Sequence, residues 1–273
     1  MSLNINTNVP SLNAQRQLET SGEALAKSLE RLSSGLRINS AADDAAGLAI
    51  ADKLRADTRI ANQAIRNAND GISAISIGEQ ALGQVGDILS RLAELSSQSA
   101  SGLVSDTQRS AIQNEFSALV SEVDRISNGT TFNGVNLLSA GNTISLQIGL
   151  DGSANSRIAF TTIDGSSSGI GLAGLAVSTA TGAQSAIAAI TSAIATVAQR
   201  RGTLGSIESR LNVAISNLRV ASENFSAAES RIRDTDVAVE TANLTRNTIL
   251  QQAGVSVLAQ ANQQPSLALK LLQ

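Results

Sequence analysis

Apolar residues recur along most of this chain at the three- and four-residue spacing of an amphipathic α-helix. Near the N-terminus, Leu18, Leu25 and Leu32 lie seven residues apart. This a/d pattern predicts a helix that ends at the SSGLRIN segment, residues 33–39. The intervening seam positions are occupied by Gly22, Leu29 and Leu36.

A longer helical tract is predicted from about residue 44 to about residue 99. Its first half has apolar residues at 3-4-3 spacing, and its second half repeats that spacing in a shifted phase. The seam therefore slips near Glu79, and at about 1.5 Å per residue the tract would be roughly 80 Å long. The seam residues are Ile65, Ala68, Ile72, Ile75, Leu82, Val85, Leu89 and Leu92.

A third tract is predicted over residues 107–127, where apolar residues follow 4-3-4-3 spacing. Ser105 or Asp106 is suited to cap its N-terminus, and Asn128-Gly129 is suited to end it. The apolar positions of this tract are Ile112, Phe116, Leu119, Val123 and Ile126.

The fourth tract has the longest unbroken heptad series, and a series of more than three heptads indicates a coiled coil. Its apolar spacing already begins at Ile187. A final helix is predicted over much of 236–272, with a kink or local break at Pro265. The heptad positions are Leu204, Ile207, Leu211, Ala214, Leu218, Ala221, Phe225, Ala228 and Ile232.

The region 129–180 has a different pattern, rich in Gly, Ser and Thr. Two short runs of alternating apolar residues flank Asp151-Gly152, which predicts a β-hairpin with a loop. The expected fold class is therefore mainly α: a long antiparallel helical coiled-coil rod with a small β-hairpin region at its tip. The alternating residues are Ile144, Leu146 and Ile148, then Ile158 and Phe160.

Composition excludes several classes of function. The 273 residues include no His and no Cys, so a zinc-peptidase motif, a Ser–His pair and a cysteine nucleophile are all absent. We therefore expect no enzyme and no cofactor. The net charge of −3 argues against nucleic acid as a main partner. No apolar run approaches about 20 residues and no secretory leader is visible, so neither a membrane span nor a cleavable signal peptide is expected.

Several segments resemble bacterial flagellins. They are SLERLSSGLRINSAADDAAGLAI (28–50), RNANDGIS (66–73), FNG (132–134), NFSAAESRIRDTDVAVE (224–240) and ANQQPSLALKLLQ (261–273). The resemblance covers almost all of 1–138 and 187–273. The chain departs from the family at SAISIGEQAL (73–82) and in its short centre, which has room only for a hairpin.

The resemblance implies a structural subunit that polymerises into the hollow helical flagellar filament used for swimming. The alternative is a minor or junction-type flagellar structural protein. An inner, filament-core domain would comprise residues 1–42 and 235–273, and an outer rod domain would comprise 43–234, with the hairpin at about 129–180.

Two sets of residues follow from this organisation. The terminal helices would carry the assembly contacts, since an apolar helix face without a partner in its own chain needs neighbours to bury it. We assign assembly to Leu18, Leu25, Leu29, Leu32, Arg31, Arg37, Leu258, Leu267 and Leu271. We assign the rod core to Ile65, Ile72, Leu82, Leu89, Ile112, Phe116, Leu204, Leu211, Leu218, Phe225 and Ile232.

Polar clusters allow more than one interpretation. Asp43, Asp44 and Asp52 are interpreted as acids at a helix start, and less well as a metal site. The terminal arginines and aspartates could be surface charge or pairs between subunits that fix register. The Ser/Thr-rich centre could carry glycans or be a bare polar loop. The charged residues concerned are Arg31, Arg37, Arg231, Arg233, Asp234 and Asp236.

The resemblance also implies partners. Arg91, Leu95 and Glu115 match the family surface recognised by Toll-like receptor 5, although Leu95 could instead be an ordinary packing residue. Other implied partners are further copies of the chain, an export chaperone at the C-terminus, and filament cap and hook-junction proteins. The implied location is the extracellular flagellar filament, reached by type III export.

Overall fold

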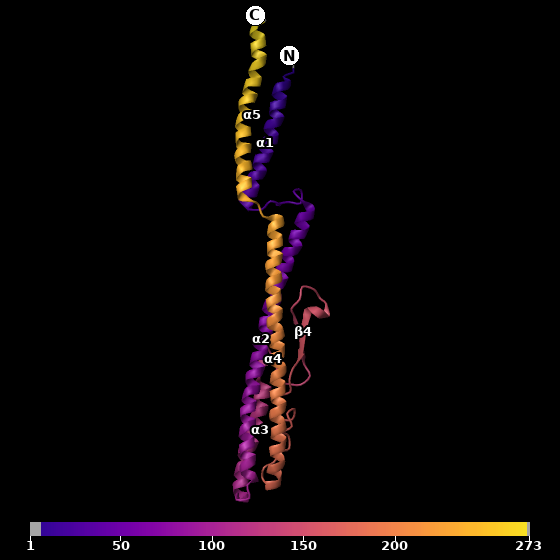
Figure 1. The fold of residues 1–273 in the computed structure, drawn as a ribbon, viewed down its shortest axis with the longest axis vertical. Coiled ribbons are helices and arrows are strands. Elements are labelled where there is room, and N and C mark those ends of the chain that lie inside the picture. The colour runs from indigo at the N-terminus through magenta and orange to yellow at the C-terminus, as the bar shows by residue number, and fades with distance from the viewer. Residues whose placement is uncertain (1–6, 272–273) are drawn as a thin grey trace. The chain divides into compact units, whose positions relative to one another are not determined.

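The computed structural model describes the backbone of residues 7–271 and the side chains of residues 7–263. The described residues form five helices and two small antiparallel sheets, so the mainly α fold class is confirmed (Figure 1). The chain divides into two compact units, residues 1–56 with 224–273 and residues 57–223. The helices are α1 (Val9–Ser34), α2 (Ala45–Ala100), α3 (Asp106–Gly129), α4 (Ala180–Arg233) and α5 (Val237–Leu271).

The first two helices begin where a side chain accepts from a free backbone N–H group of the first turn. Asn8 accepts from the N–H of Ser11 at 3.1 Å, and Asp44 accepts from the N–H of Gly47 at 2.9 Å. Helix α1 ends at Gly35, whose φ of 71° is left-handed and therefore suits glycine. These caps account for the break between the first two predicted tracts.

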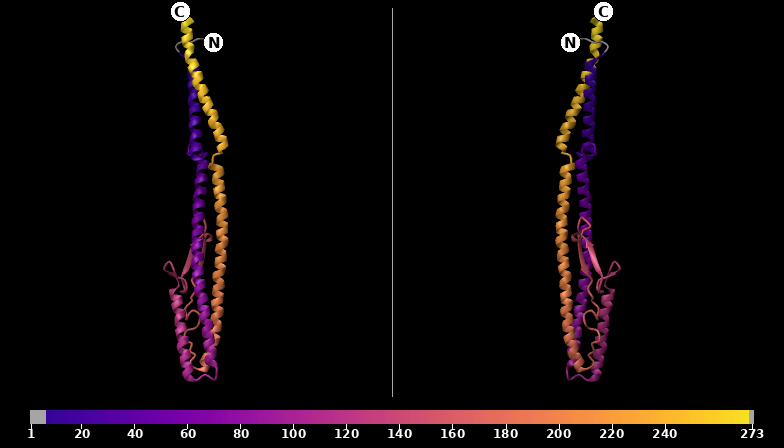
Figure 2. Two further views of the ribbon diagram at one scale, coloured as in Figure 1. Left: turned by 90° about the vertical axis from the view of Figure 1, so that its left-hand side faces the viewer. Right: turned by 90° about the vertical axis from the view of Figure 1, so that its right-hand side faces the viewer.

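The unit of residues 57–223 has a continuous apolar core. Parts of α2 and α4 run side by side with α3, as the views in Figures 1 and 2 agree. Buried in the core are the predicted positions Leu82, Leu89, Ile112, Phe116, Leu204 and Leu211, and Leu218 is buried in a smaller cluster with Ala61 and Ala64. Ile65 and Ile72 are partly buried against the core, and Ile215, which lies beside the predicted seam residue Ala214, is buried as well.

Helix α4 is long and apolar enough to pass a length-and-composition test for a membrane span, through a window with a mean hydropathy of 1.3. Much of this hydropathy comes from alanine. Ala183, Ala186 and Ile190 are fully buried in the same core cluster as Phe116. One face of this stretch therefore packs in the helical core, and 28% of the window is buried.

Two hairpins follow α3. Strands β1 (Thr131–Phe132) and β2 (Val135–Asn136) are joined by Asn133-Gly134, where both residues have positive φ, 49° and 78°. Two such residues are what a tight two-residue hairpin turn requires. Strands β3 (Thr143–Gln147) and β4 (Arg157–Thr161) form the predicted longer hairpin.

The β3–β4 hairpin lies along the flank of α2, and the prediction of a hairpin at the tip was wrong in this respect. The amide of Asn67 donates to the carbonyl of Gln147 at 3.0 Å, and Leu146 packs closely over Gly71. The end of this unit is formed by the turn between α2 and α3 (Figure 2). The cause is burial: Ile158 and Phe160 point into the core and hold the hairpin against the helices.

The unit of residues 1–56 and 224–273 is built around α1 and α5, which pack against each other. The amide of Asn8 donates to the carbonyl of Ala261 at 2.9 Å, and the Ser11 hydroxyl donates to Asn262 at 2.8 Å. The side chain of Leu18 lies over Gly254, where an added Cβ atom would be in van der Waals contact with it. Helix α5 is one helix that continues past Pro265, without the local break that the sequence suggested.

The links that join α1 to α2 and α4 to α5 are bonded to each other. The N–H of Arg37 donates to the carbonyl of Arg233 at 2.6 Å, and the N–H of Thr235 donates to the carbonyl of Gly35 at 3.0 Å. Ile38 in the first link is buried. The first turns of α2 and the last turns of α4 belong to this unit, so its boundaries lie beyond residues 42 and 235.

Candidate assembly surfaces

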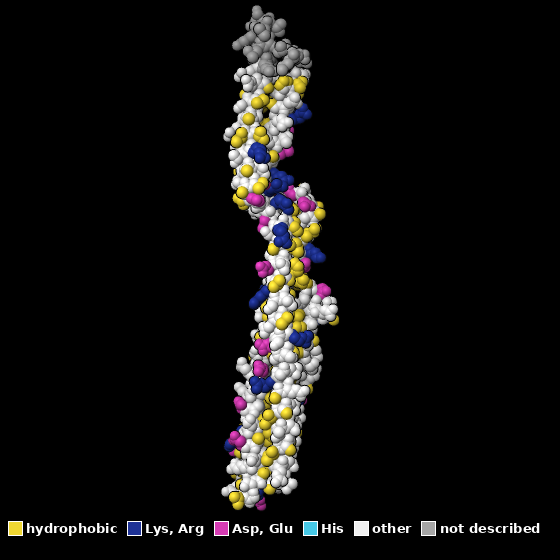
Figure 3. All heavy atoms as spheres, viewed as in Figure 1, with side chains coloured by type: hydrophobic (Ala, Val, Ile, Leu, Met, Phe, Trp, Pro, Cys, Tyr) yellow, Lys and Arg dark blue, Asp and Glu magenta, His cyan; other side chains and the backbone are white. Residues whose placement is uncertain are grey.

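Helices α1 and α5 expose large apolar side chains over much of their length (Figure 3). On α1, Leu29 is 52% exposed and Leu12 is 51% exposed. Isolated exposed apolar residues are common, but a series along paired helices indicates a surface that a partner covers. On α5 the exposed apolar residues are Val237, Val239, Ile249, Leu250, Val255 and Val257.

The contact between α1 and α5 has few large buried side chains. Most of its buried positions are small, namely Ser11, Ala14, Ser28 and Ala261. Of the residues assigned to assembly, Leu18, Leu25, Leu32 and Leu258 are partly buried in this unit. Leu267 and Leu271 lie outside the described side chains. Phe225 and Ile232, assigned to the rod core, are partly buried and belong to this terminal unit.

Most of the terminal charged residues have partners within their own chain. Arg31 lies 3.7 Å from the buried carboxylate of Glu240, and Arg37 donates to the carbonyl of Ile232 at 2.5 Å. Arg233 lies 3.8 Å from Asp52 and donates to a carbonyl of the first link. These contacts hold the two links together within one chain.

The remaining charged residues of this region also have local roles or are exposed. The carboxylate of Asp236 accepts from two N–H groups at the start of α5, and the backbone of Asp234 pairs with that of Leu36. Arg231 is exposed on the last turn of α4.

The acidic residues at the start of α2 serve structural contacts. The carboxylate of Asp43 lies 2.6 Å from the Lys27 ammonium and accepts from the N–H groups of Asn39 and Ser40. These donors, with Lys27 foremost, hold the pKa of Asp43 well below its usual value of 3.8. Asp44 caps α2. Among the described residues, no group of three or more acidic side chains is placed to hold a metal ion.

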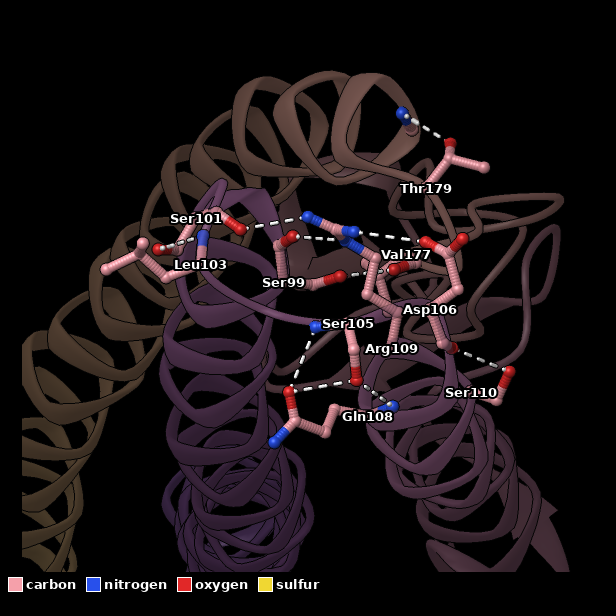
Figure 4. Close-up of polar contacts among 11 residues, drawn as sticks. Ser99, Ser101, Leu103, Ser105, Asp106, Gln108, Arg109, Ser110, Val177 and Thr179 are labelled. Atoms are coloured by element: carbon pink, nitrogen blue, oxygen red, sulfur yellow. Dashed lines mark hydrogen bonds and ion pairs between the residues drawn. The ribbon is translucent and has the colours of Figure 1, made fainter.

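A second surface is the turn between α2 and α3, shown in Figure 4. Helix α3 begins with the capping box of Ser105 and Gln108, so Ser105 is the cap among the two candidates from the sequence. The buried guanidinium of Arg109 donates to the carbonyls of Ser99 at 2.9 Å and Ser101 at 2.8 Å. These bonds satisfy carbonyls that the end of α2 leaves without helical partners.

Leu103 stands on this well-bonded turn and points away from Arg109 (Figure 4). Its side chain is 97% exposed, the highest value among the exposed large apolar residues of the described chain. The carboxylate of Asp106, on the other side of Arg109 in Figure 4, is 96% exposed and lies 3.2 Å from Arg109. The turn therefore presents one apolar side chain and one carboxylate on a firmly held backbone.

An apolar cavity of about 140 Å³ lies where α2 meets the hairpins. Its walls come from α2, β1, β2, β3 and β4. The residues that line it are Asp70, Gly71, Ala74, Phe132, Asn133, Val135, Leu137, Ile144, Leu146 and Phe160.

The three residues matched to receptor recognition do not form one exposed patch. Arg91 is exposed and contacts Glu94 at 2.9 Å and Glu115 at 2.8 Å. The bonds to Glu115 and then Glu94 raise the pKa of Arg91. Leu95 is only 1% exposed and belongs to the core. Arg91 and Glu115 alone could therefore contact a partner without a change in the fold.

Sequence reasoning missed Leu103, Arg109 and the cavity. The segment SGLVSD (101–106) does carry a signal, since a leucine stands in a short polar turn where it has no seam to join. Arg109 lies on the polar side of its predicted helix, and its burial depends on the carbonyls at the end of α2. The cavity depends on contacts between elements far apart in the sequence.

Two family descriptions match the chain. "Bacterial flagellin N-terminal helical region" matches residues 5–143, and "Bacterial flagellin C-terminal helical region" matches residues 187–272. The chain is 45% identical to a flagellin of Halalkalibacterium halodurans over 270 residues, which cover 98% of this chain and 99% of the relative. It is 42% identical to the flagellar filament 30.7 kDa core protein of Treponema maltophilum over 282 residues, with the same coverage.

A solved structure is also similar. The crystal structure of Bacillus cereus flagellin aligns with a TM-score of 0.51 and 27% identity. The alignment covers 56% of this chain and 88% of that one.

Proposed function

The chain belongs to the bacterial flagellin family and is a structural subunit of the flagellar filament. We propose that its terminal helices, α1 and α5, make the contacts that hold the filament together. Two observations support this proposal. Both helices expose a series of large apolar side chains, and the contact between the two helices buries few large side chains. Such a pair gains stability when neighbouring subunits cover its apolar faces. The assembly residues assigned from the sequence belong to this proposal.

Contacts of this kind between neighbouring subunits would build an open polymer. Two different surfaces of one subunit that meet in neighbours form a heterologous contact, and such contacts build a helical filament when the rotation does not close a ring. The family's filament is extracellular, and the subunit would reach it through the flagellar export apparatus. The exposed apolar face of α5 supports an export chaperone as a transient partner, since that face needs cover before assembly.

Further partners are proposed on family membership. A cap complex and hook-junction proteins would contact the same terminal helices at the ends of the filament. Receptor recognition would use Arg91 and Glu115, which are exposed and paired with each other. We propose no catalytic role, in keeping with a structural family.

The experiment that tests the proposal compares filament growth of purified subunits by negative-stain microscopy. The assembly variant combines Leu12→Ser with Leu29→Ser, since both side chains are half-exposed and their loss leaves the folded subunit intact. The control is Leu150→Ser, which removes a leucine of 37% exposure in the β3–β4 hairpin loop. We expect filaments from the control and few or none from the double variant.

Two outcomes would overturn the proposal. One is normal filament growth by the double variant. The other is failure of the unchanged protein to form anything but monomers or closed rings in salt that promotes filaments. A strain that lacks this chain and still grows full-length filaments would favour the minor or junction-type role instead.

A further inference from the structure

An exposed apolar side chain and an apolar cavity lie at opposite ends of α3. Leu103 stands on the turn that precedes α3. The cavity lies next to β1 and β2, which follow α3 directly. Both features belong to the unit of residues 57–223, so their separation is fixed within one subunit.

We propose that Leu103 of one subunit inserts into this cavity of the next subunit along the filament axis, which deepens the proposed function and rests on it. The occupant we assign is thus a second copy of this chain. The cavity of about 140 Å³ is close to the size of an engineered apolar cavity of about 150 Å³ that binds benzene. An isobutyl side chain is of similar bulk, and the lining by Phe132, Ile144 and Phe160 is suited to it.

The cavity lies where helix α3 ends and the hairpins begin. Helix α3 runs along only part of α2, and beyond its end the β3–β4 hairpin occupies the flank of α2 (Figure 2). A following subunit could therefore place its α2–α3 turn at the end of the first subunit's α3. The stretch of α2 from Ala74 to Ala100 rises about 40 Å at about 1.5 Å per residue, so the contact predicts a subunit repeat of about 40–50 Å along the axis.

The charges at the two features constrain how they could meet. The α2–α3 turn presents the exposed carboxylate of Asp106, and the cavity lining includes Asp70, which carries the same charge. Arg66, one helical turn before Asp70, is exposed, and its described bonds are to the neutral side chain of Gln63. The contact is favourable where Asp106 faces Arg66 and unfavourable where it faces Asp70, so charge favours one register over others.

Leu103 and the cavity are different surfaces of the same subunit, so a contact between them would be head to tail. A projection that fits a cavity elsewhere on the same molecule joins copies head to tail and does not close a dimer. The proposed contact would therefore extend a row of subunits without limit.

The test uses cysteine pairs, because the natural chain has no cysteine. Full-length subunits with Leu103→Cys and Ala74→Cys are polymerised and then oxidised. The two thiols of one chain are roughly 40 Å apart, so a disulfide must join two subunits. We expect a ladder of covalent multimers on denaturing gels from filaments. The matched control pair, Leu150→Cys with Ala74→Cys, should give no ladder.

Two variants test the energy of the contact. Leu103→Ser should leave the thermal stability of the subunit unchanged, because the side chain is exposed, and should raise the critical concentration for polymerisation about tenfold or more. Ala74→Leu, which fills the cavity from inside, should have the same effect on polymerisation.

The outcomes separate this inference from the proposed function. Normal filaments without a ladder, together with unchanged polymerisation of Leu103→Ser and Ala74→Leu, would overturn the inference and leave the filament role in place. A helical reconstruction with a repeat far from about 40–50 Å between contacting subunits would overturn it too. Failure of the unchanged chain to polymerise would overturn both.

Discussion

Arg109 is a charged side chain that is buried although it has only one carboxylate contact. Its guanidinium is surrounded mainly by carbonyl oxygens at the end of α2, and Asp106 lies at the exposed edge. Hydrogen bonds from a charged donor are stronger than neutral ones, and the carbonyls lose water when they are buried. One arginine thus holds the α2–α3 turn together.

Replacement of this arginine should destabilise the subunit. For Arg109→Met we expect the free energy of unfolding to fall by about 2–3 kcal/mol, because buried carbonyls lose charged donors. The matched control on the same helix is Arg125→Gln, whose solvent-screened pair with Glu122 should contribute little to stability. Urea unfolding followed by circular dichroism measures both. Equal effects of the two variants would contradict the role given to Arg109.

Asp43 should make stability depend on acidity. Its pKa is lowered in the folded chain, so its contribution to stability is fully present above its usual pKa of 3.8 and declines as the pH falls below that value. We expect Asp43→Asn to lower the unfolding temperature at neutral pH and to approach the unchanged protein in strong acid. Thermal unfolding from about pH 7 to about pH 2 measures this. A difference that is constant over that range would count against the Lys27 contact.

At the scale of elements, helix α2 contains glycines with opposite roles. Gly71 lies under Leu146 of β3, where a Cβ atom would collide with the leucine side chain, whereas nothing lies within 4 Å of a Cβ at Gly83. Close approach of a strand to a helix backbone is a known use of glycine. Gly71 therefore allows the hairpin to lie flat on α2.

These two positions give a paired prediction. Gly71→Ala should push the hairpin away and lower the unfolding temperature, while Gly83→Ala should raise the free energy of unfolding by up to about 1 kcal/mol through helix propensity. Thermal unfolding of both variants checks this. Stabilisation by Gly71→Ala would show that the hairpin is not held against that glycine.

Most helix boundaries could be predicted from the sequence to within a few residues, because the helices follow a local apolar period and end at local signals such as Gly35. The exception is the start of α4 at Ala180, which precedes the apolar spacing that begins at Ile187. The position of the β3–β4 hairpin could not be predicted, since it depends on Leu146 meeting Gly71 far away in the chain. The burial of Leu95 was left open for the same reason. The sequence allowed either a packing residue or a recognition residue, and only the neighbouring helices show that the side chain is covered.

At the scale of the whole molecule, the two units should differ in local stability. The α1–α5 contact buries mostly small side chains, whereas residues 57–223 enclose a cluster that includes Leu89 and Phe116. We expect amides of α1 to exchange with deuterium at least about tenfold faster than those near Leu89 in unpolymerised subunits. Polymerisation should slow exchange in α1. Equal protection in the free subunit would contradict the thin contact described for the terminal helices.

The surface proposed to join copies was the least accessible to prediction from the sequence. Leu103 was visible as a leucine in a polar turn, but its possible counterpart is made by residues from α2 and four strands. A cavity of this kind has no spacing pattern in the chain. The apolar faces of the terminal helices, in contrast, follow directly from heptad spacing.

The bonded links between the helices have a mechanical consequence. The chain passes between the terminal helices and the long helices twice, and backbone bonds from Arg37 to Arg233 and from Thr235 to Gly35 tie these two passages together. Tension applied to one passage is therefore shared with the other through these two bonds. In a rotating propeller this would spread the load at the joint of each subunit over both passages.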